Sequence, residues 1–312
     1  ALLKISAWVN QNFAYLIPTS KVESTFLFYL LEYNYHRIRY EGNRGGSQGS
    51  LNTGMVKSLF FAFPKKSEQQ KIAEILSTWD EAIQKCEQTI TQLIDRNKEL
   101  AVQLLLGNKR IKGFETSWKN YPFEKVLKKV KRPVNWRDDE LYNLISVRRR
   151  SGGIFYRDAL YGHQIKVKNL YSVKSGDFLF SKMQIVHGAS ALVTDEFNDS
   201  KISGSYIAVR AKDESLLNLN FLNWYSKTSK FYHQTFISSY GVHIEKMTFD
   251  FELFLSETIK LPSLEEQTAI ANVLEQADKE LKLSENKLLN LKEQKKGLMQ
   301  KLLTGEIRVN VK

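Results

Sequence analysis

The chain has few of the features on which secreted, membrane-bound or zinc-containing proteins depend. Its 312 residues include one cysteine, Cys86, so a disulfide framework is excluded and a cytoplasmic protein is expected. No apolar run is long enough to span a bilayer, and residues 1–15 lack a signal-peptide pattern. The five histidines have neither ligand spacing nor cysteine partners, which argues against a zinc site.

Sequence motifs for catalysis are also missing. There is no Asn-Pro-Pro-Tyr or Asp-Pro-Pro-Tyr run of the kind used in amino-methylation, no glycine-rich cofactor loop after a strand and no P-loop. The acidic pairs Asp138-Asp139 and Asp195-Glu196 are more typical of solvated loops than of metal ligands. We therefore expect no metal, no cofactor and no enzyme activity within this chain.

A long block of sequence occurs twice. Residues 64–110 reappear as residues 262–308 without a gap, at an offset of 198 residues (262 minus 64). Two equal arms separated by an insert the size of a domain predict a pseudo-symmetric molecule. Identical positions in the two copies include Pro64/Pro262, Glu68/Glu266, Gln69/Gln267, Ile72/Ile270, Leu76/Leu274, Leu104/Leu302 and Gly107/Gly305.

Each copy has the pattern of a long coiled-coil helix, with a proline before it and a glycine after it. Apolar or small residues recur at alternating steps of four and three, and such a narrow stripe must be buried, so we expect the two helices to pair. An antiparallel register with Trp79 opposite Lys295 and Asn97 opposite Ala277 accommodates both polar interruptions. The seam residues are Ile72, Leu76, Trp79, Ile83, Ile90, Leu93, Leu100 and Leu104 in the first copy, and Ile270, Leu274, Leu281, Leu288, Leu291, Leu298 and Leu302 in the second.

Positive charge is concentrated outside the repeated helices. Of the net charge of +12, residues 1–66 carry 8 basic and 3 acidic side chains, and residues 111–262 carry 23 and 16. Residues 67–110 carry 6 and 7, which is close to neutral. This distribution is expected if the globular parts contact phosphate and the helices contact protein, although basic surface alone is a weak signal.

Residues 111–262 predict one mixed domain of strands and helices. We expect a short amphipathic helix at 123–130, an aromatic-rich helix at 221–236, and strands at 141–147, 177–181, 189–194 and 205–210. Residues 1–63 have a similar order, because a helix begins near Phe26 as one begins near Phe221, and a glycine-rich turn follows each. By this alignment, the first segment corresponds to the closing half of a second such domain.

The order of half-domain, helix, full domain and helix resembles the DNA specificity subunit of type I restriction-modification systems. The helices begin near Pro64-Lys-Lys-Ser-Glu-Gln-Gln-Lys-Ile-Ala and Pro262-Ser-Leu-Glu-Glu-Gln-Thr-Ala-Ile-Ala. Three further runs strengthen the resemblance: Val9-Asn-Gln-Asn-Phe-Ala, Gly176-Asp-Phe-Leu-Phe-Ser and Leu302-Leu-Thr-Gly. The resemblance, in the order of half-domain, helix, full domain and helix, covers nearly the whole chain.

The resemblance implies an α+β protein in which mixed α/β target recognition domains are joined by two long antiparallel coiled-coil helices. Residues 1–63 would be the C-terminal part of the first recognition domain, lacking its opening half, and residues 111–262 the second. Residues 64–110 and 263–312 would be the spacer helices. The implied partners are double-stranded DNA, methyltransferase subunits and, through them, the restriction subunit, with no membrane and no catalytic role.

Several short segments have the residue types that recognise DNA. Three adjacent arginines followed by a turn can supply donors to phosphates or, in bidentate geometry, to guanine. Mixed amide and cationic side chains suit base recognition, and loops of small residues allow close approach to phosphate. The candidates are Arg148, Arg149, Arg150, Gln164, Lys166, Lys168, Lys182, Gln184, His187, Ser238, Ser239, Tyr240, Gly241 and His243, with Arg44 and Gln48 in the first segment.

Two of these candidate segments have a simpler interpretation. The arginine run can be an ordinary charged loop, and the alternation at Lys166 and Lys168 fits the solvent face of a strand. Two other classes of protein also remain open. One is a truncated or silent specificity cassette, and the other is a coiled-coil interaction protein that binds no DNA.

Overall fold

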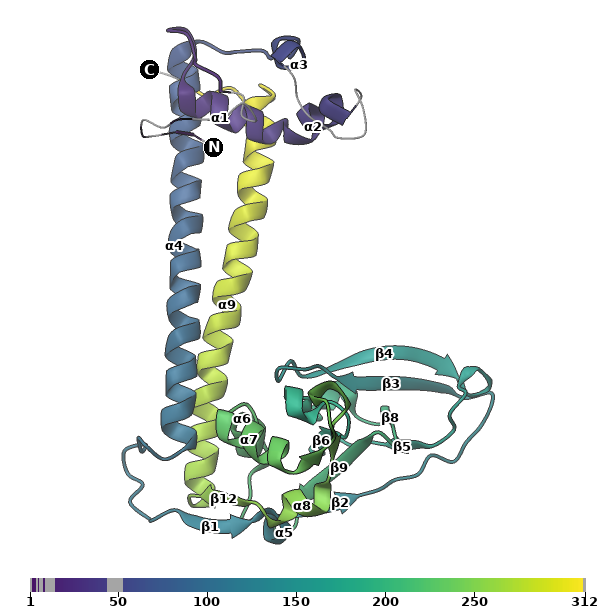
Figure 1. The fold of residues 1–312 in the computed structure, drawn as a ribbon. Helices are drawn as coiled ribbons and strands as arrows, with labels where there is room; N and C mark the ends of the chain where they lie inside the picture. Colours follow the sequence, from purple (N-terminus) through teal and green to yellow (C-terminus); the bar gives the residue numbers. More distant parts are fainter. Residues whose placement is uncertain (1, 4, 6–7, 9–14, 44–52, 311–312) are drawn as a thin grey trace. The chain divides into compact units, whose positions relative to one another are not determined.

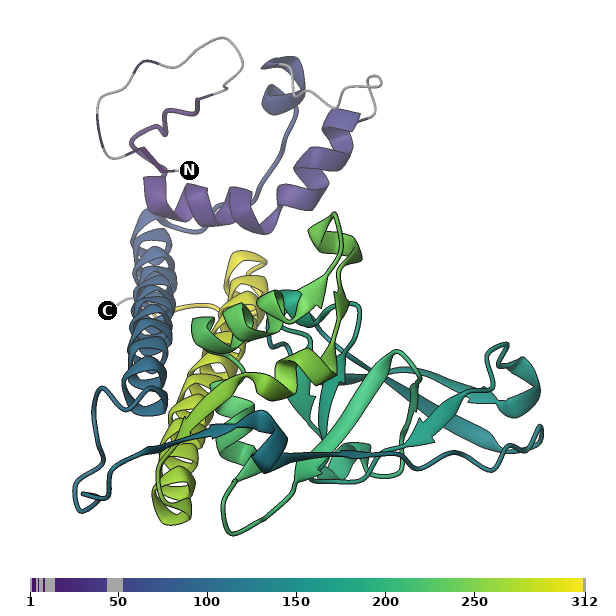
Figure 2. The same cartoon turned by 60° about the horizontal axis from the view of Figure 1, so that its bottom comes forward.

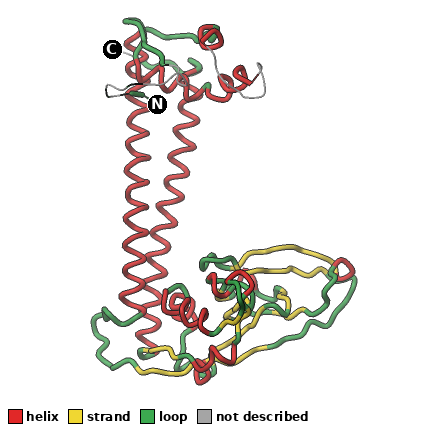
Figure 3. The backbone as a smooth tube through the Cα atoms, viewed as in Figure 1, coloured by secondary structure: helices red, strands yellow, loops and turns green. Residues whose placement is uncertain are grey.

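The computed structural model describes the chain except for residues 1, 4, 6–7, 9–14, 44–52 and 311–312 (Figure 1). It divides into two compact units, one made of Ala1–Leu93 with Glu280–Lys312 and the other of Ile94–Lys279. Among the described residues, strands occur only in the second unit (Figure 3). No helix in the described part of the chain is both long and apolar enough to cross a membrane.

The two long helices confirm the sequence repeat. Helix α4 runs from Lys66 to Leu105 and helix α9 from Leu264 to Leu303, and each has 40 residues. Both end before a glycine in the left-handed conformation, Gly107 at φ 73° and Gly305 at φ 78°. Glycine adopts this conformation without the steric cost that a Cβ imposes, so it ends both helices at equivalent positions.

All the predicted seam residues of α4 and α9 are buried or half-buried, whereas Leu283, which lies off the seam, is 70% exposed. The predicted antiparallel register is also confirmed. Within the second unit, Asn97 Nδ2 donates to Ala277 O at 2.8 Å. Within the first unit, Cys86 lies beside Ser284, whose carbonyl oxygen is 3.6 Å from the Cys86 thiol.

The second polar interruption, Lys295, has partners that the sequence did not indicate. Its ammonium lies 2.7 Å from Asp80 Oδ1 and 3.4 Å from Glu32 Oε2, and it stands over the ring of Tyr29. The Tyr29 hydroxyl donates to Asp80 at 2.6 Å, and burial together with this acceptor raises the pKa of Tyr29. The half-buried charge of Lys295 is therefore neutralised by Asp80 and Glu32 and covered by the ring of Tyr29.

Two Arg–Glu clamps, one at each end of the helix pair, are related by the repeat. Arg110 Nε and Nη2 donate to the two carboxylate oxygens of Glu266 at 2.6 and 2.7 Å. Arg308 makes the same bidentate contact with Glu68 at 2.8 and 2.6 Å. Each clamp joins an arginine five residues past the end of one long helix (Leu105 or Leu303) to the first turn of the other. Hydrogen bonds from Arg308 lower the pKa of Glu68 although burial opposes this shift.

A glutamine beside each clamp anchors a short helix. Gln69 accepts from the backbone N–H of Glu23 at 2.9 Å, and Gln267 accepts from that of Asn218 at 2.9 Å. Glu23 caps α1 (Ser24–Tyr33), and Asn218 caps α6 (Leu219–Tyr225). The duplicated glutamine therefore ties each long helix to a short helix earlier in the chain, α1 in the case of α4 and α6 in the case of α9.

The first unit is helical in its described part. Helices α1, α2 (Tyr35–Asn43) and α3 (Thr53–Lys57) precede α4. The apolar face of α1 packs on the ends of α4 and α9, a contact that Figure 1 shows at the end of the helix pair. The buried residues of this core are Phe26, Tyr29, Leu30, Ile72, Ala73, Leu76, Met299, Leu302 and Leu303.

The second unit contains two four-stranded sheets, with strand orders β2-β9-β6-β7 and β4-β3-β8-β5. Two short pairs, β1-β12 and β10-β11, complete the strands described. The strands are β1 (Lys119–Pro122), β2 (Leu127–Val130), β3 (Leu141–Val147), β4 (Ile154–Tyr161), β5 (Leu170–Ser172), β6 (Phe178–Ser181), β7 (Ser190–Leu192), β8 (Lys201–Ser203), β9 (Tyr206–Ala211), β10 (Ser239–Tyr240), β11 (Thr248–Phe249) and β12 (Thr258–Leu261).

Helices cover one face of the first of these sheets. Helices α6, α7 (Ser229–Ile237) and α8 (Phe251–Ser256) lie beside it, as Figure 2 shows. Phe180 of β6 contacts the rings of Phe231 in α7, Phe251 and Phe254 in α8, and Phe249 in β11. The aromatic-rich segment expected at 221–236 contributes Phe221, Tyr225 and Phe231 to this buried core.

Two expectations about this domain are wrong in detail. The helix expected at 123–130 is the single turn α5 (Phe123–Val126), because the residues after it pair with β9 as strand β2. The helix expected at 221–236 is two helices: α6 ends at Tyr225, and Thr228 accepts from Phe231 N and so caps α7, which begins at Ser229. In both places, tertiary pairing or a local cap overrides the helical pattern.

The same Glu→Gln substitution should lower the free energy of unfolding by different amounts in the two clamps. Glu266 is fully buried and also accepts from Trp118 Nε1 at 3.2 Å. Glu266→Gln should lower the free energy of unfolding by about 1–3 kcal/mol, because charge-assisted hydrogen bonds are lost in a dry site. Glu68→Gln should cost less, because its partner Arg308 is 68% exposed and water screens the pair. Calorimetry of both variants would contradict this if Glu68→Gln were the more damaging.

Candidate nucleic-acid interface

The arginine turn, residues 148–153, connects β3 to β4 and has an unusual backbone. Arg150 and Ser151 have positive φ angles of 56° and 54°, which side chains other than glycine rarely adopt. Their N–H groups donate to His187 O at 2.6 Å and to Gly188 O at 2.9 Å. Two backbone hydrogen bonds therefore hold the turn against η2 (Ile185–His187) and the glycine that follows it.

Gly188 makes this attachment possible. It has φ 75°, and a Cβ at this position would lie 1.8 Å from the hydroxyl oxygen of Tyr232. The same hydroxyl lies 3.0 Å from Ser151 Oγ. Helix α7, which carries Tyr232, thus fastens η2 and the arginine turn together, and backbone strain of this kind persists only where the surroundings enforce it.

The three arginines have different environments. The guanidinium of Arg148 lies over the ring of Phe155, 4.3 Å from its centroid. Arg149 Nη2 is 2.8 Å from Glu245 Oε2. All three side chains are exposed, and among the described residues Arg150 has no side-chain hydrogen bond or ion pair. Of the three, Arg150 is therefore the guanidinium most available to a ligand.

A third segment, residues 238–246, reaches the same place. It contains η4 (Ile244–Lys246), whose Glu245 pairs with Arg149 and lies 3.4 Å from His187 Nε2. Tyr240 and His243 of this segment are exposed, whereas Ser238 is fully buried. We call the arginine turn, residues 184–188, Tyr232 and Glu245 the turn cluster. It brings together three of the segments predicted from the sequence.

Buried polar atoms lie in or beside this cluster without partners. Gln184 Oε1, His187 Nε2 and Ser238 Oγ make no hydrogen bond to any described residue. The 3.4 Å between His187 Nε2 and Glu245 is at the outer limit of such a bond. Buried polar groups are normally paired, so these three atoms are exceptions in the described part of the chain.

The remaining predicted residues lie elsewhere. Gln164, Lys166 and Lys168 follow the far end of β4, opposite the arginine turn, and the seven residues of β3 separate the two ends by about 23 Å. Lys168 pairs with Asp138 at 3.0 Å, and residues 165–169 are not in a strand. The structure therefore does not bring these three residues to the turn cluster. Arg44 and Gln48 lie outside the described residues.

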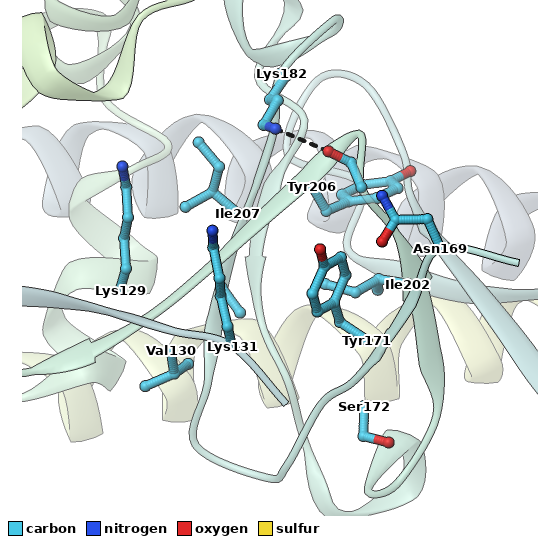
Figure 4. A pocket seen from close by; sticks show the side chains of 12 residues that line it. Lys129, Val130, Lys131, Asn169, Tyr171, Ser172, Lys182, Ile202, Tyr206 and Ile207 are labelled. Atoms are coloured by element: carbon cyan, nitrogen blue, oxygen red, sulfur yellow. Dashed lines mark hydrogen bonds between the residues drawn. The ribbon is translucent and has the colours of Figure 1, made fainter. Parts of the chain in front are cut away.

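Sequence reasoning found Lys182 but missed two lysines beside it. Lys129, Lys131 and Lys182 line a cavity of about 210 Å³ in the second unit (Figure 4). Lys129 is in β2 and Lys131 comes directly after this strand ends, two residues further on, so extended backbone at this point would direct both side chains to the same side. That spacing was a usable signal, but the expected helix at 123–130 obscured it. No group of His, Cys, Asp and Glu in the described part of the chain could hold a metal ion.

Comparisons with known proteins agree with this fold. A family model described as "Type I restriction modification DNA specificity domain" matches residues 1–96 and 124–293. The chain is similar to a putative type I restriction enzyme MjaX specificity subunit from Methanocaldococcus jannaschii, at 25% identity over 333 residues, covering 96% of this chain and 72% of that protein.

Two solved structures share the fold. The HsdS subunit from Thermoanaerobacter tengcongensis matches 92% of this chain and 71% of its own, with TM-score 0.53 and 16% identity. The S subunit of a type I restriction-modification system from M. genitalium matches 94% and 74%, with TM-score 0.56 and 12% identity. At such low identity, the likeness establishes the common architecture and not the role of single residues.

Because Gly188 lies so close to Tyr232, a side chain at position 188 should destabilise the protein. Gly188→Ala should lower the free energy of unfolding by about 2 kcal/mol or more, because the new Cβ clashes and the left-handed backbone penalises it. Tyr232→Phe is the control, since it removes one hydrogen bond and should cost about 1 kcal/mol. Thermal melting of both variants measures the difference, and an alanine variant as stable as the parent would refute the packing described.

Proposed function

Since the chain belongs to the family of type I restriction-modification DNA specificity subunits, we propose that its second unit recognises one half-site of a bipartite target through the turn cluster. Recognition of DNA is the function of this family, and the chain is a specificity subunit. The proposal assigns that recognition to particular residues. Its central element is Arg150.

One observation supports the assignment most directly. Segments from three parts of the chain meet at an exposed turn whose backbone is fixed and whose Arg150 guanidinium has no side-chain partner among the described residues. An arginine can donate two hydrogen bonds to the O6 and N7 atoms of guanine in the major groove. A fixed backbone reduces the entropy lost when the side chain docks.

Arg149 and Arg148 have supporting roles in this proposal. Arg149 is paired with Glu245, and exposed ion pairs of this kind are weak, so a DNA phosphate can replace the carboxylate. Arg148, stacked over Phe155, is positioned for a phosphate contact that carries no sequence information. The cluster thus combines one group for base recognition with others that fix the orientation of the DNA.

The long helices are the proposed docking surface for methyltransferase subunits. Their seam is occupied by the partner helix, and their outer faces carry nearly balanced charge, which suits contact with protein. The chain itself would contribute no chemistry, because its proposed task is to position the methyltransferase and, through it, the restriction subunit. A cytoplasmic location follows from that partnership.

Substitution of single arginines tests the assignment. Arg150→Ala should relax preference at one base position, at a cost of about 1–3 kcal/mol, without loss of stability. Arg148→Ala is the matched control and should weaken binding uniformly across sequences. Selection of bound duplexes from a randomised pool gives the base preferences. Identical preferences for Arg150→Ala and the parent would remove this residue from base recognition.

Charge reversal on the helices tests the docking surface. Glu81→Lys with Lys85→Glu alters two exposed positions of α4 and keeps the net charge unchanged. We expect reduced co-purification of the methyltransferase subunits, because complementary charges would then face like charges. A variant with Arg148, Arg149 and Arg150 all replaced by alanine should assemble normally. The opposite pattern of losses would place docking on the recognition domain.

A further inference from the structure

The lysine cavity, lined by Lys129, Lys131 and Lys182, combines positive charge from two segments of the chain. Lys129 is in β2, Lys131 follows that strand, and Lys182 follows β6. Figure 4 shows the side chains of Lys129 and Lys131 extending in the same direction, with Tyr171 and Asn169 on another side of the cavity. Tyr171 and Asn169 add hydrogen-bonding groups to its wall.

This charge is poorly neutralised. The residues that line the cavity include no aspartate and no glutamate. Lys182 Nζ donates to a neutral carbonyl, Gly204 O, at 2.8 Å, and Lys131 has no side-chain partner among the described residues. Lys129 contacts Glu252, but that carboxylate lies outside the lining and is 72% exposed. Like charges that converge in a hollow surface repel one another, and an anion there removes the repulsion.

The cavity lies close to the turn cluster. Lys182 is five residues before His187, and five residues span at most about 17 Å. Successive base pairs rise by about 3.4 Å, so one duplex can contact both places within a single half-site. Phosphate contacts fix the register in which base contacts are made.

From this geometry we infer that the lysine cavity is a phosphate site, which takes a backbone phosphate of the same DNA half-site that the turn cluster recognises. This inference rests on the proposed function. The ligand chemistry is a phosphate ester, and the source is the DNA duplex. A free nucleotide has the same chemistry and is the alternative source that an experiment must separate.

Two substitutions with opposite expected effects on DNA binding test the phosphate site: one removes a positive charge and the other removes a negative charge. For a random-sequence duplex, the slope of log affinity against log salt changes by about 0.9 for each phosphate contact. Lys131→Gln should reduce the slope by about that amount. Glu252→Gln should tighten binding, because it releases Lys129 from its carboxylate. The measurement is fluorescence anisotropy over a salt series from about 50 to 200 mM.

Matched controls come from exposed residues outside the cavity. Lys260→Gln and Glu124→Gln make the same chemical changes elsewhere in the second unit, and both should leave the slope nearly unchanged. If Lys131→Gln behaves as Lys260→Gln does while the parent binds with a steep salt dependence, the phosphate site is wrong and the proposed function stands. If the parent does not bind duplex DNA at all, the proposed function itself fails.

Calorimetric titration with deoxyadenosine monophosphate and with inorganic phosphate separates the two sources. The inference predicts no saturable binding of either probe to the parent protein. Saturable binding that Lys131→Gln abolishes, together with an unchanged salt slope for duplex DNA, would overturn the assignment to the DNA backbone and identify a nucleotide site instead.

Discussion

The bidentate contact between arginine and glutamate, made once at each end of the helix pair, is the constraint from which the rest of this structure follows. Arg110 with Glu266 and Arg308 with Glu68 each join the end of one long helix to the start of the other. An antiparallel pair of helices can slide by one turn without exposing its seam. Two bidentate contacts at fixed positions remove that freedom, because a shift would leave buried charge unpaired.

Much of the fold could be predicted from the sequence because the long helices repeat a strong pattern. The equal lengths of α4 and α9, their glycine ends and the contact between Asn97 and Ala277 were all expected from spacing. The environment of Lys295 was not, since Glu32 and Tyr29 come from a distant segment. Pairing between strands far apart in sequence likewise decided that residues 127–130 form β2 and not a helix.

The candidate site was only partly predictable, because composition identifies suitable side chains and not their positions. Arg150, His187 and Glu245 come together through positive φ angles and a glycine packed on a tyrosine, none of which has a clear sequence signal. The same limit applies to Gln164, which composition alone could not place relative to the arginines; strand β4 separates them. Lys131 was detectable in principle from its two-residue spacing to Lys129.

The central claim is that residues 111–262 form a recognition domain that determines one half of a bipartite target. Exchange of this segment for its counterpart in another family member, followed by methylation mapping in cells that also express the methyltransferase, tests it most directly. The account predicts that one half of the methylated motif changes while the other half and the spacer stay the same, because the helices that set the spacing are retained. An unchanged motif, or a change in both halves, would contradict it.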